Sequence, residues 1–203
     1  MHERTGQIIG LYERHAHAFD QKRGRALFER SWLDRFATLV PAGGHILDLG
    51  CGMGEPIARY FIEQGYRVTG IDSAPTMISL CRGRFSDHVW QTADMRRLAL
   101  GDRFDGVLAF DSFFHLSPDD QRAMFAVFAA HAAPGAPLMF TAGPAFGEAI
   151  GNFEGETLYH ASLDPDEYRS LLARHGFAVV RYVPEDPDCG GRTVWLARRD
   201  EAR

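Results

Sequence analysis

The chain has 203 residues, of which 45% are hydrophobic and 24% are charged, and its formal net charge is −5. This composition at this length is typical of one globular domain, which excludes extensive disorder and low-complexity repeats. The negative charge gives no broad attraction to nucleic acids or anionic membranes, so we expect neither as a partner.

The first part of the chain predicts two helices that precede the main sheet. Apolar residues recur at three- and four-residue steps from Thr5 to Val40, with a break around residues 20–24. We expect residues 5–40 to form a helical cap within a single domain that spans residues 1–203.

From residue 45 onward, predicted strands and helices alternate. Strands are expected over residues 45–49, 66–71, 88–92, 104–110 and 136–142, and helices over 54–64, 74–85 and 118–132. After a helix over residues 165–175, two strands joined by a tight return predict an antiparallel pair, at 177–183 and 193–198. Repeated strand–helix–strand units predict an α/β fold with a mostly parallel sheet covered on both faces.

Three of these helices begin with capping signals, in which a short polar residue is followed closely by proline. The pairs are Ser73 with Pro75, Ser117 with Pro118, and Asp164 with Pro165. The segment over residues 143–163 is longer than an ordinary connection between a strand and a helix, and we interpret it as an inserted lid. The alternative is a surface loop without ligand contact.

Alternating glycines follow the first predicted strand, in the run Asp48-Leu49-Gly50-Cys51-Gly52-Met53-Gly54. In open α/β sheets the ligand lies beyond the carboxyl ends of the strands, and glycines there let it approach the bare backbone. The third glycine comes one residue earlier than in a dinucleotide fingerprint, and Glu55 follows where phosphate would lie. The loop therefore predicts a nucleoside cofactor without a pyrophosphate.

Acids follow the next two strands. Asp72 is suited to accept hydrogen bonds from both hydroxyls of a ribose, although capping of the next helix is an alternative. Asp94 is suited to accept from the exocyclic amine of an adenine, while Met95 packs on the ring. For Asp94 the alternative is a solvated loop acid.

Together these motifs resemble class I S-adenosylmethionine (SAM)-dependent methyltransferases, whose signature is an acid followed by alternating glycines. The likeness covers about residues 10–200, including residues 104–111 as the fourth strand. It implies a Rossmann-like, doubly wound sheet of seven strands, mostly parallel with an antiparallel C-terminal hairpin. It also implies SAM as cofactor, S-adenosylhomocysteine (SAH) as its product, and methyl transfer to an oxygen, nitrogen or carbon of a small molecule.

The resemblance assigns cofactor-binding roles along the ends of the strands and on the N-terminal helix, which is expected to close over the methionine end of SAM. These residues are Tyr12, Phe19, Arg23, Asp48, Gly50, Cys51, Gly52, Gly54, Asp72, Ser73, Met77, Asp94, Met95, Phe110 and Asp111. Lys22 and Arg25 are alternatives to Arg23 as the cation for the SAM carboxylate. The sulfonium is expected near Phe110 and Asp111.

His115 follows the fourth strand and is the catalytic candidate, because an imidazole with an unperturbed pKa of about 6.5 can take a proton near neutral pH. A packed histidine is the alternative. Arg96 and Arg97 are expected on a solvated face, and a substrate clamp is the alternative.

The remaining expectations concern setting and alternative functions. The three cysteines are far apart and form no C-x-x-C pair, which predicts no disulfide framework, no metal site and a reducing, cytoplasmic setting. No run approaches the roughly 20 apolar residues of a membrane span, and the first residues lack a signal-peptide pattern. Three alternatives stay open: a non-catalytic SAM-binding module, another transfer from SAM, and an NAD-dependent oxidoreductase.

Overall fold

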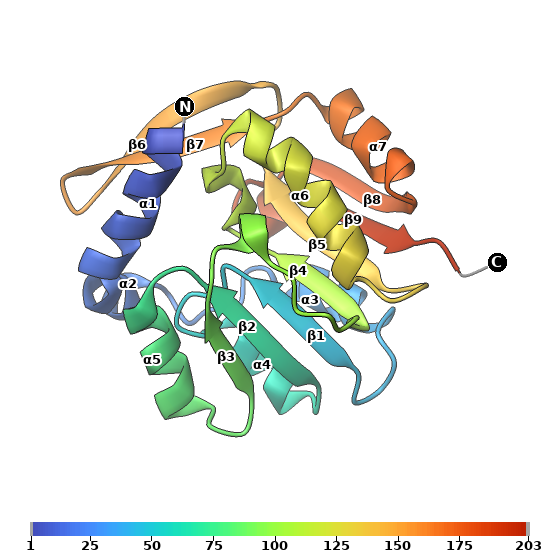
Figure 1. Ribbon diagram of the computed structural model, residues 1–203, viewed down its shortest axis with the longest axis horizontal. Coiled ribbons are helices and arrows are strands. Elements are labelled where there is room, and N and C mark those ends of the chain that lie inside the picture. The colour runs from blue at the N-terminus through green and yellow to red at the C-terminus, as the bar shows by residue number, and fades with distance from the viewer. Residues whose placement is uncertain (1, 202–203) are drawn as a thin grey trace.

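The computed structural model describes residues 2–201, with side chains from Gln7 onward. Within this range one sheet has the strand order β3-β2-β1-β4-β5-β9-β8 (Figure 1). Its strands are β1 (His45–Leu49), β2 (Arg67–Asp72), β3 (Val89–Thr92), β4 (Gly106–Ala109), β5 (Pro137–Ala142), β8 (Phe177–Asp186) and β9 (Arg192–Arg199). The first five strands are parallel, and β9 runs antiparallel to both β5 and β8. The predicted Rossmann-like, mostly parallel α/β sheet with an antiparallel C-terminal hairpin is confirmed.

Helices cover both faces of this sheet, and each face has its own core. One face packs against α3 (Arg30–Ala37), α4 (Ile57–Glu63) and α5 (Pro75–Arg84), and the other against α6 (Pro118–His131) and α7 (Pro165–Arg174). Because side chains alternate along a strand, Ile46 enters the first core and Leu47 the second. Strands buried on both faces explain why the sequence shows continuous apolar runs. No helix among the described residues is long and apolar enough to cross a membrane.

The N-terminal segment contains three helices where the sequence predicts two. Helix α1 (His2–Arg14) is followed directly by α2 (Ala16–Lys22), because His15 adopts a non-helical conformation between them. Residues 23–29 are irregular, and α3 then lies against the sheet. Figure 1 shows α1 and α2 apart from the sheet, beside α5.

The capping predictions are confirmed for two helices and wrong for the third. Ser117 and Asp164 each accept a backbone N–H of the first turn of their helix. At α5 the N-cap is Ala74 rather than Ser73, and the acceptor for the Ala74 N–H is Asp72 Oδ1, at 2.9 Å. The predicted helix over 54–64 is also shorter, since α4 begins at Ile57.

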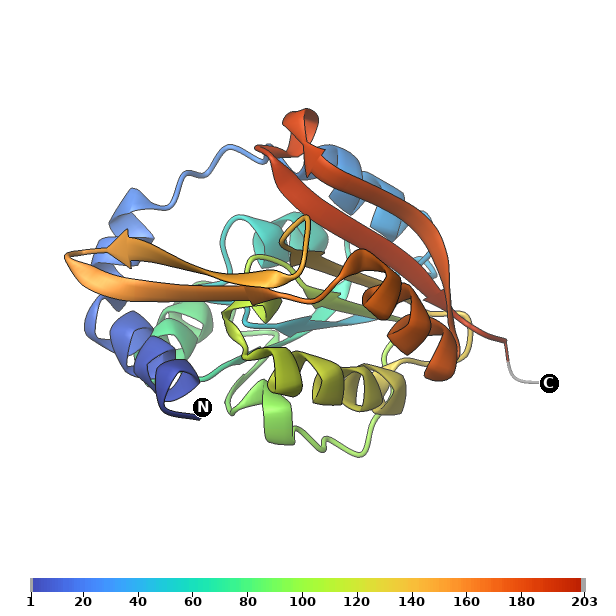
Figure 2. The same cartoon turned by 90° about the horizontal axis from the view of Figure 1, so that it is seen from above.

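The segment over residues 143–163 is a β-hairpin rather than an irregular loop. Strands β6 (Gly147–Phe153) and β7 (Glu156–Ser162) pair antiparallel in a separate sheet. Glu154 and Gly155 at the tip both have positive φ, at 52° and 83°, which is the conformation of a tight two-residue hairpin turn. Figure 2 shows this hairpin reaching across the molecule toward α1 and α2.

Candidate active site

A pocket lies where the loops after β1, β2, β3 and β4 meet helices α1 and α2. It brings together most of the residues predicted from the sequence, namely Tyr12, Phe19, Gly50, Gly52, Asp72, Ser73, Met77, Asp94, Met95, Asp111 and His115. Its other lining residues were missed by sequence reasoning: Ile8, Ile9, Ile71, Ala93, Arg96, Ser112 and Leu116. Most of these lie within a few positions of a predicted residue, and Ile8 and Ile9 belong to the apolar pattern of the first helix. Their closeness in sequence to the predicted residues, and the apolar pattern of the first helix, could therefore have located them.

Gly50 allows the loops after β1 and β4 to pack against each other. Its φ is +75°, and a Cβ at this position would lie 2.3 Å from the Cβ of Ser112. The loop is fixed by a hydrogen bond from the Gly50 N–H to the Ile71 carbonyl at 2.7 Å, and by one from the Ser112 hydroxyl to the Leu49 carbonyl at 2.6 Å. Only glycine combines this conformation with this close approach.

Asp72 organises the glycine loop as well as lining the pocket. Its Oδ2 accepts the Gly52 N–H and its Oδ1 accepts the Ala74 N–H, each at 2.9 Å. Burial raises the pKa of this carboxyl, although the hydrogen bonds from backbone N–H groups act in the opposite direction. Asp72 therefore lines the pocket, and the capping alternative is wrong, because Asp72 bonds the N–H of the N-cap residue Ala74 and no side chain caps the first turn of α5.

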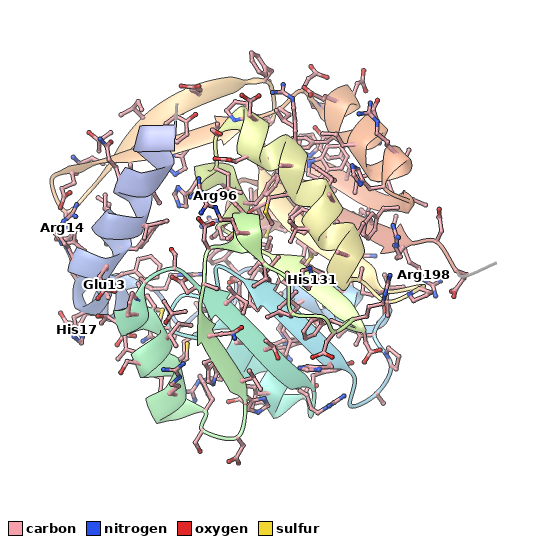
Figure 3. The ribbon with its side chains drawn as sticks, in the orientation of Figure 1. Glu13, Arg14, His17, Arg96, His131 and Arg198 are labelled. Atoms are coloured by element: carbon pink, nitrogen blue, oxygen red, sulfur yellow. The ribbon has the colours of Figure 1, made fainter. Side chains whose placement is uncertain are left out.

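Asp94 is held by Arg96, which the sequence placed wrongly on a solvated face. The Arg96 guanidinium binds both oxygens of Asp94, with Nη2 at 2.6 Å from Oδ2, and its Nη1 lies 3.2 Å from Asp120. Burial would raise the pKa of Asp94, but the hydrogen bonds from Arg96 outweigh it and hold the pKa below its ordinary value. Figure 3 shows Arg96 between α1 and α6. Asp94 therefore keeps its charge at the rim of the pocket.

His115 is buried, and its two ring nitrogens have fixed roles. Nδ1 lies 2.9 Å from the Tyr159 carbonyl, an acceptor only, so Nδ1 carries the proton. Nε2 therefore accepts the hydroxyl of Tyr12 at 3.0 Å. Burial lowers the pKa of His115 to about 4, so the ring is neutral around pH 7. Burial, followed by the charges of Asp111 and Asp72, raises the pKa of Tyr12, which stays a hydrogen-bond donor.

Five residues that the sequence assigned to cofactor binding are not among those that line the pocket. Asp48 is buried in β1, Phe110 packs in the core beside α3, and Gly54 lies against Phe85 and Cys81 of the α5 region. Cys51 packs against the same core, and its thiol points toward the Gly52 carbonyl at 3.6 Å.

The fifth residue is Arg23, whose Nη2 binds the fully buried Glu29 at 3.0 Å. The alternative cations are paired as well. Lys22 binds Glu154 of the β6–β7 hairpin, and Arg25 binds Asp20 at 2.7 Å. Among the described residues, no group of three or more His, Cys, Asp and Glu side chains is arranged to hold a metal ion.

The tip of the β6–β7 hairpin packs on the helices that cover the pocket. The Phe153 ring stacks on Tyr12 with centroids 6.2 Å apart and meets Phe19 edge-on at 5.9 Å. Two acids beside it pair with α1, α2 and the residue between them, since Glu156 binds Arg14 and His15, and Glu154 binds Lys22.

Comparison with known proteins finds similarity to methyltransferases. Residues 46–135 match the family model described as a methyltransferase domain. The chain is 31% identical over 168 residues to an O-methyltransferase of Pyrenophora dematioidea, an alignment that covers 76% of this chain and 62% of that protein. The chain spans about three fifths of the length of the first curated relatives.

Solved structures share the fold. CalS10, an amino pentose methyltransferase from Micromonospora echinaspora with bound SAM, has a TM-score of 0.70 at 23% identity, covering 90% of this chain and 95% of that one. Magnesium protoporphyrin IX methyltransferase from Synechocystis PCC 6803 has a TM-score of 0.72 at 16% identity, covering 97% of each chain. Residues 46–135 of this chain therefore match a methyltransferase domain, and the chain shares its fold with solved SAM-dependent methyltransferases.

Proposed function

We propose that this chain binds SAM in the pocket described above and transfers its methyl group to an oxygen, nitrogen or carbon of a small molecule, releasing SAH. The observation that carries the proposal is the convergence of four strand-end loops on one pocket. These loops contribute the bare backbone of Gly50 and Gly52, and the acids Asp72, Asp94 and Asp111.

The residues of the pocket fit the parts of this cofactor. Asp72 accepts two backbone N–H groups, and its oxygens keep lone pairs for two ribose hydroxyls. Asp94, charged and fixed by Arg96, offers an acceptor for the adenine amine, and Met95 offers a polarizable surface for the ring. Gly54, Phe110, Cys51 and Asp48 then act behind this surface rather than as direct contacts.

Tyr12 and His115 lie at the end of the pocket where we place methyl transfer. Bound SAM supplies a methyl group already activated by the sulfonium charge. The protein's contribution is orientation of the acceptor and exclusion of water, worth up to roughly 7–11 kcal/mol in favourable systems. In neutral His115, Nε2 is the nitrogen that accepts a hydrogen bond. A hydroxyl of the methylated substrate that replaces the Tyr12 hydroxyl would donate its hydrogen bond to this atom. Its low pKa suits it to orienting the acceptor and only briefly holding a proton.

The N-terminal cap and the β6–β7 hairpin act as the cover of this site in our proposal. The cavity volume is about 110 Å³, below the roughly 300–1,000 Å³ of ordinary ligand pockets, so admission of a nucleoside requires the cover to move. The contacts of Phe153 with Tyr12 and Phe19 link the two parts of the cover. Both parts belong to the single domain predicted from the sequence.

A small acceptor is preferred to a nucleic acid, because the net charge of −5 does not favour phosphate backbones. Similar proteins include an O-methyltransferase and a glycopeptide N-methyltransferase, which supports leaving both oxygen and nitrogen open as the acceptor atom. A cytoplasmic setting stays a prediction from the cysteine pattern.

The decisive experiment is calorimetric titration with SAM and SAH, followed by assay of SAH release with a panel of phenols, amines and carbon acids. Asp72→Ala is expected to weaken SAM binding at least about 10- to 100-fold, because loss of even one charge-assisted hydrogen bond costs about 1.5–3 kcal/mol. Asp102→Ala removes an exposed carboxylate elsewhere and should change nothing. Because Asp72 also holds Gly52, thermal unfolding of each variant separates lost binding from a damaged loop. Absence of SAM binding by the wild-type protein would refute the proposal, and binding of NAD instead would favour an oxidoreductase.

A further inference from the structure

Asp111 is gripped by an arginine that lies 81 residues further along the chain. The Arg192 Nε lies 3.2 and 3.3 Å from the two oxygens of Asp111, and its Nη2 lies 3.0 Å from Oδ2. Arg192 is the first residue of β9, so the C-terminal hairpin reaches the end of β4 through this contact. A guanidinium that binds both carboxylate oxygens fixes the plane of the carboxylate as well as its charge.

The surroundings hold both partners in place. Arg192 lies over the Phe28 ring with its Cζ 4.4 Å from the centroid, and its Nη1 donates to the Gly190 carbonyl at 3.1 Å. Asp111 has a left-handed backbone with φ of +51°, and its N–H donates to the hydroxyl of Thr141 at 2.8 Å. A non-glycine residue in this conformation is uncommon, and here β5 and β9 together determine it.

The carboxylate of Asp111 is the acid of the pocket suited to a cation. Asp72 accepts two backbone N–H groups in the part of the pocket assigned to the ribose, and Asp94 lies at the loop after β3, in the part assigned to the adenine. Asp111 instead follows β4 and lines the pocket together with Tyr12 and His115. A carboxylate has about four lone-pair sites, and Arg192 does not fill them all.

We propose that Arg192 is a positioning residue that holds the Asp111 carboxylate ready to receive the α-ammonium group at the methionine end of SAM. This inference rests on the proposed function and adds the residue that aligns one of its contacts. Arg192 acts through Asp111 and does not itself touch the cofactor. Without the guanidinium, the Asp111 backbone keeps its hydrogen bond to Thr141, but the side-chain carboxylate loses its fixed orientation. Its contact with the ammonium group therefore weakens.

The test compares three ligands that differ only at the amino-acid end. SAH carries both the ammonium and the carboxylate, its decarboxylated analogue S-adenosyl-3-thiopropylamine keeps only the ammonium, and 5′-methylthioadenosine lacks both. For Arg192→Ala we expect binding of the first two to weaken about tenfold, as for partial loss of one charge-assisted contact, while 5′-methylthioadenosine changes less than twofold. Asp111→Asn should give the same pattern. Arg192→Lys should recover part of the affinity, since lysine restores the positive charge but cannot bind both carboxylate oxygens as the planar guanidinium does.

Arg198→Ala is the matched control, because Arg198 lies on the same strand but binds the Gly135 carbonyl and Glu201 at the other end of the sheet (Figure 3). It should leave all three affinities unchanged. Equal weakening of 5′-methylthioadenosine in Arg192→Ala would overturn the proposal, because it would indicate general damage to the pocket. Weakening of SAH alone would also overturn it, since Arg192 would then contact the carboxylate directly. Failure of the proposed function is a different result, in which wild-type protein binds none of the ligands.

Discussion

Replacing Asp48 by asparagine is expected to stabilise this protein by an amount that grows with pH. Asp48 is 5% exposed in β1, between the two covered faces of the sheet. Burial raises the pKa of its carboxyl to about 7, with a further contribution from the charge of Asp72. Asparagine has nearly the same shape but cannot ionise, so it removes the cost of a buried charge.

The sign and size follow from proton linkage. The unfolded carboxyl has a pKa of about 3.9, so the folded state binds more protons between about pH 4 and pH 7, and this group makes stability fall as pH rises through that window. Above pH 7 the full cost is about three pKa units, or about 4 kcal/mol. Between pH 5 and pH 8 the advantage of Asp48→Asn over wild type should therefore grow by about 3 kcal/mol.

Urea unfolding of both proteins at several pH values, followed by circular dichroism, measures this difference. Titrating groups that do not interact with Asp48 contribute equally to both proteins and cancel, provided that the m-values agree. Asp102→Asn is the control, because it makes the same chemical change at an exposed side chain outside the sheet. If the difference between Asp48→Asn and wild type stayed flat from pH 5 to pH 8, the assignment of a buried, neutral-prone carboxyl at this position would be wrong.

Three further predictions test packing, catalysis and closure. Gly70→Ala should destabilise the protein by at least about 1–3 kcal/mol in urea unfolding, because its Cβ would lie 2.3 Å from the Trp90 ring, whereas Gly83→Ala, with open space in α5, should be neutral or slightly stabilising. His115→Gln should lower kcat about 100-fold, and a variant with full turnover would contradict the proposed role of His115. The kcat of the wild-type protein should be flat above about pH 5 and should fall as His115 is protonated through about pH 4. Glu156→Gln should speed SAH release about two- to fivefold in stopped-flow measurements, and an unchanged rate would contradict the proposed cover.

The acids of the site show how far local sequence patterns reach. The sequence locates Asp72 and Asp94 because each lies at or just beyond the end of a strand, and strand ends meet at one edge of a parallel sheet. Asp48 is the acid that opens the glycine motif, but its side chain lies inside the sheet, since side chains alternate along β1. Whether each of these acids points into the pocket or into the sheet depends on the residue at which its strand ends. Apolar periodicity locates a strand end only to within a few residues.

Arg96 and Arg192 show what local patterns could not supply. Arg96 stands beside another arginine in the sequence, and only the approach of Asp120 from α6 makes it part of the site. Arg192 reaches Asp111 because β9 inserts between β5 and β8. No spacing in the chain encodes a contact across 81 residues.

The sequence alone determined the alternating α/β plan, the glycine loop and the acids at the strand ends, because apolar periodicity and turn chemistry are local properties of the chain. Tertiary structure decided the partners of the charged groups, the tautomer of His115 and the placement of the β6–β7 hairpin over α1. Those features depend on which distant segments pack together and how much water they exclude, and pairing, ionisation and hydrogen-bond direction follow from that packing.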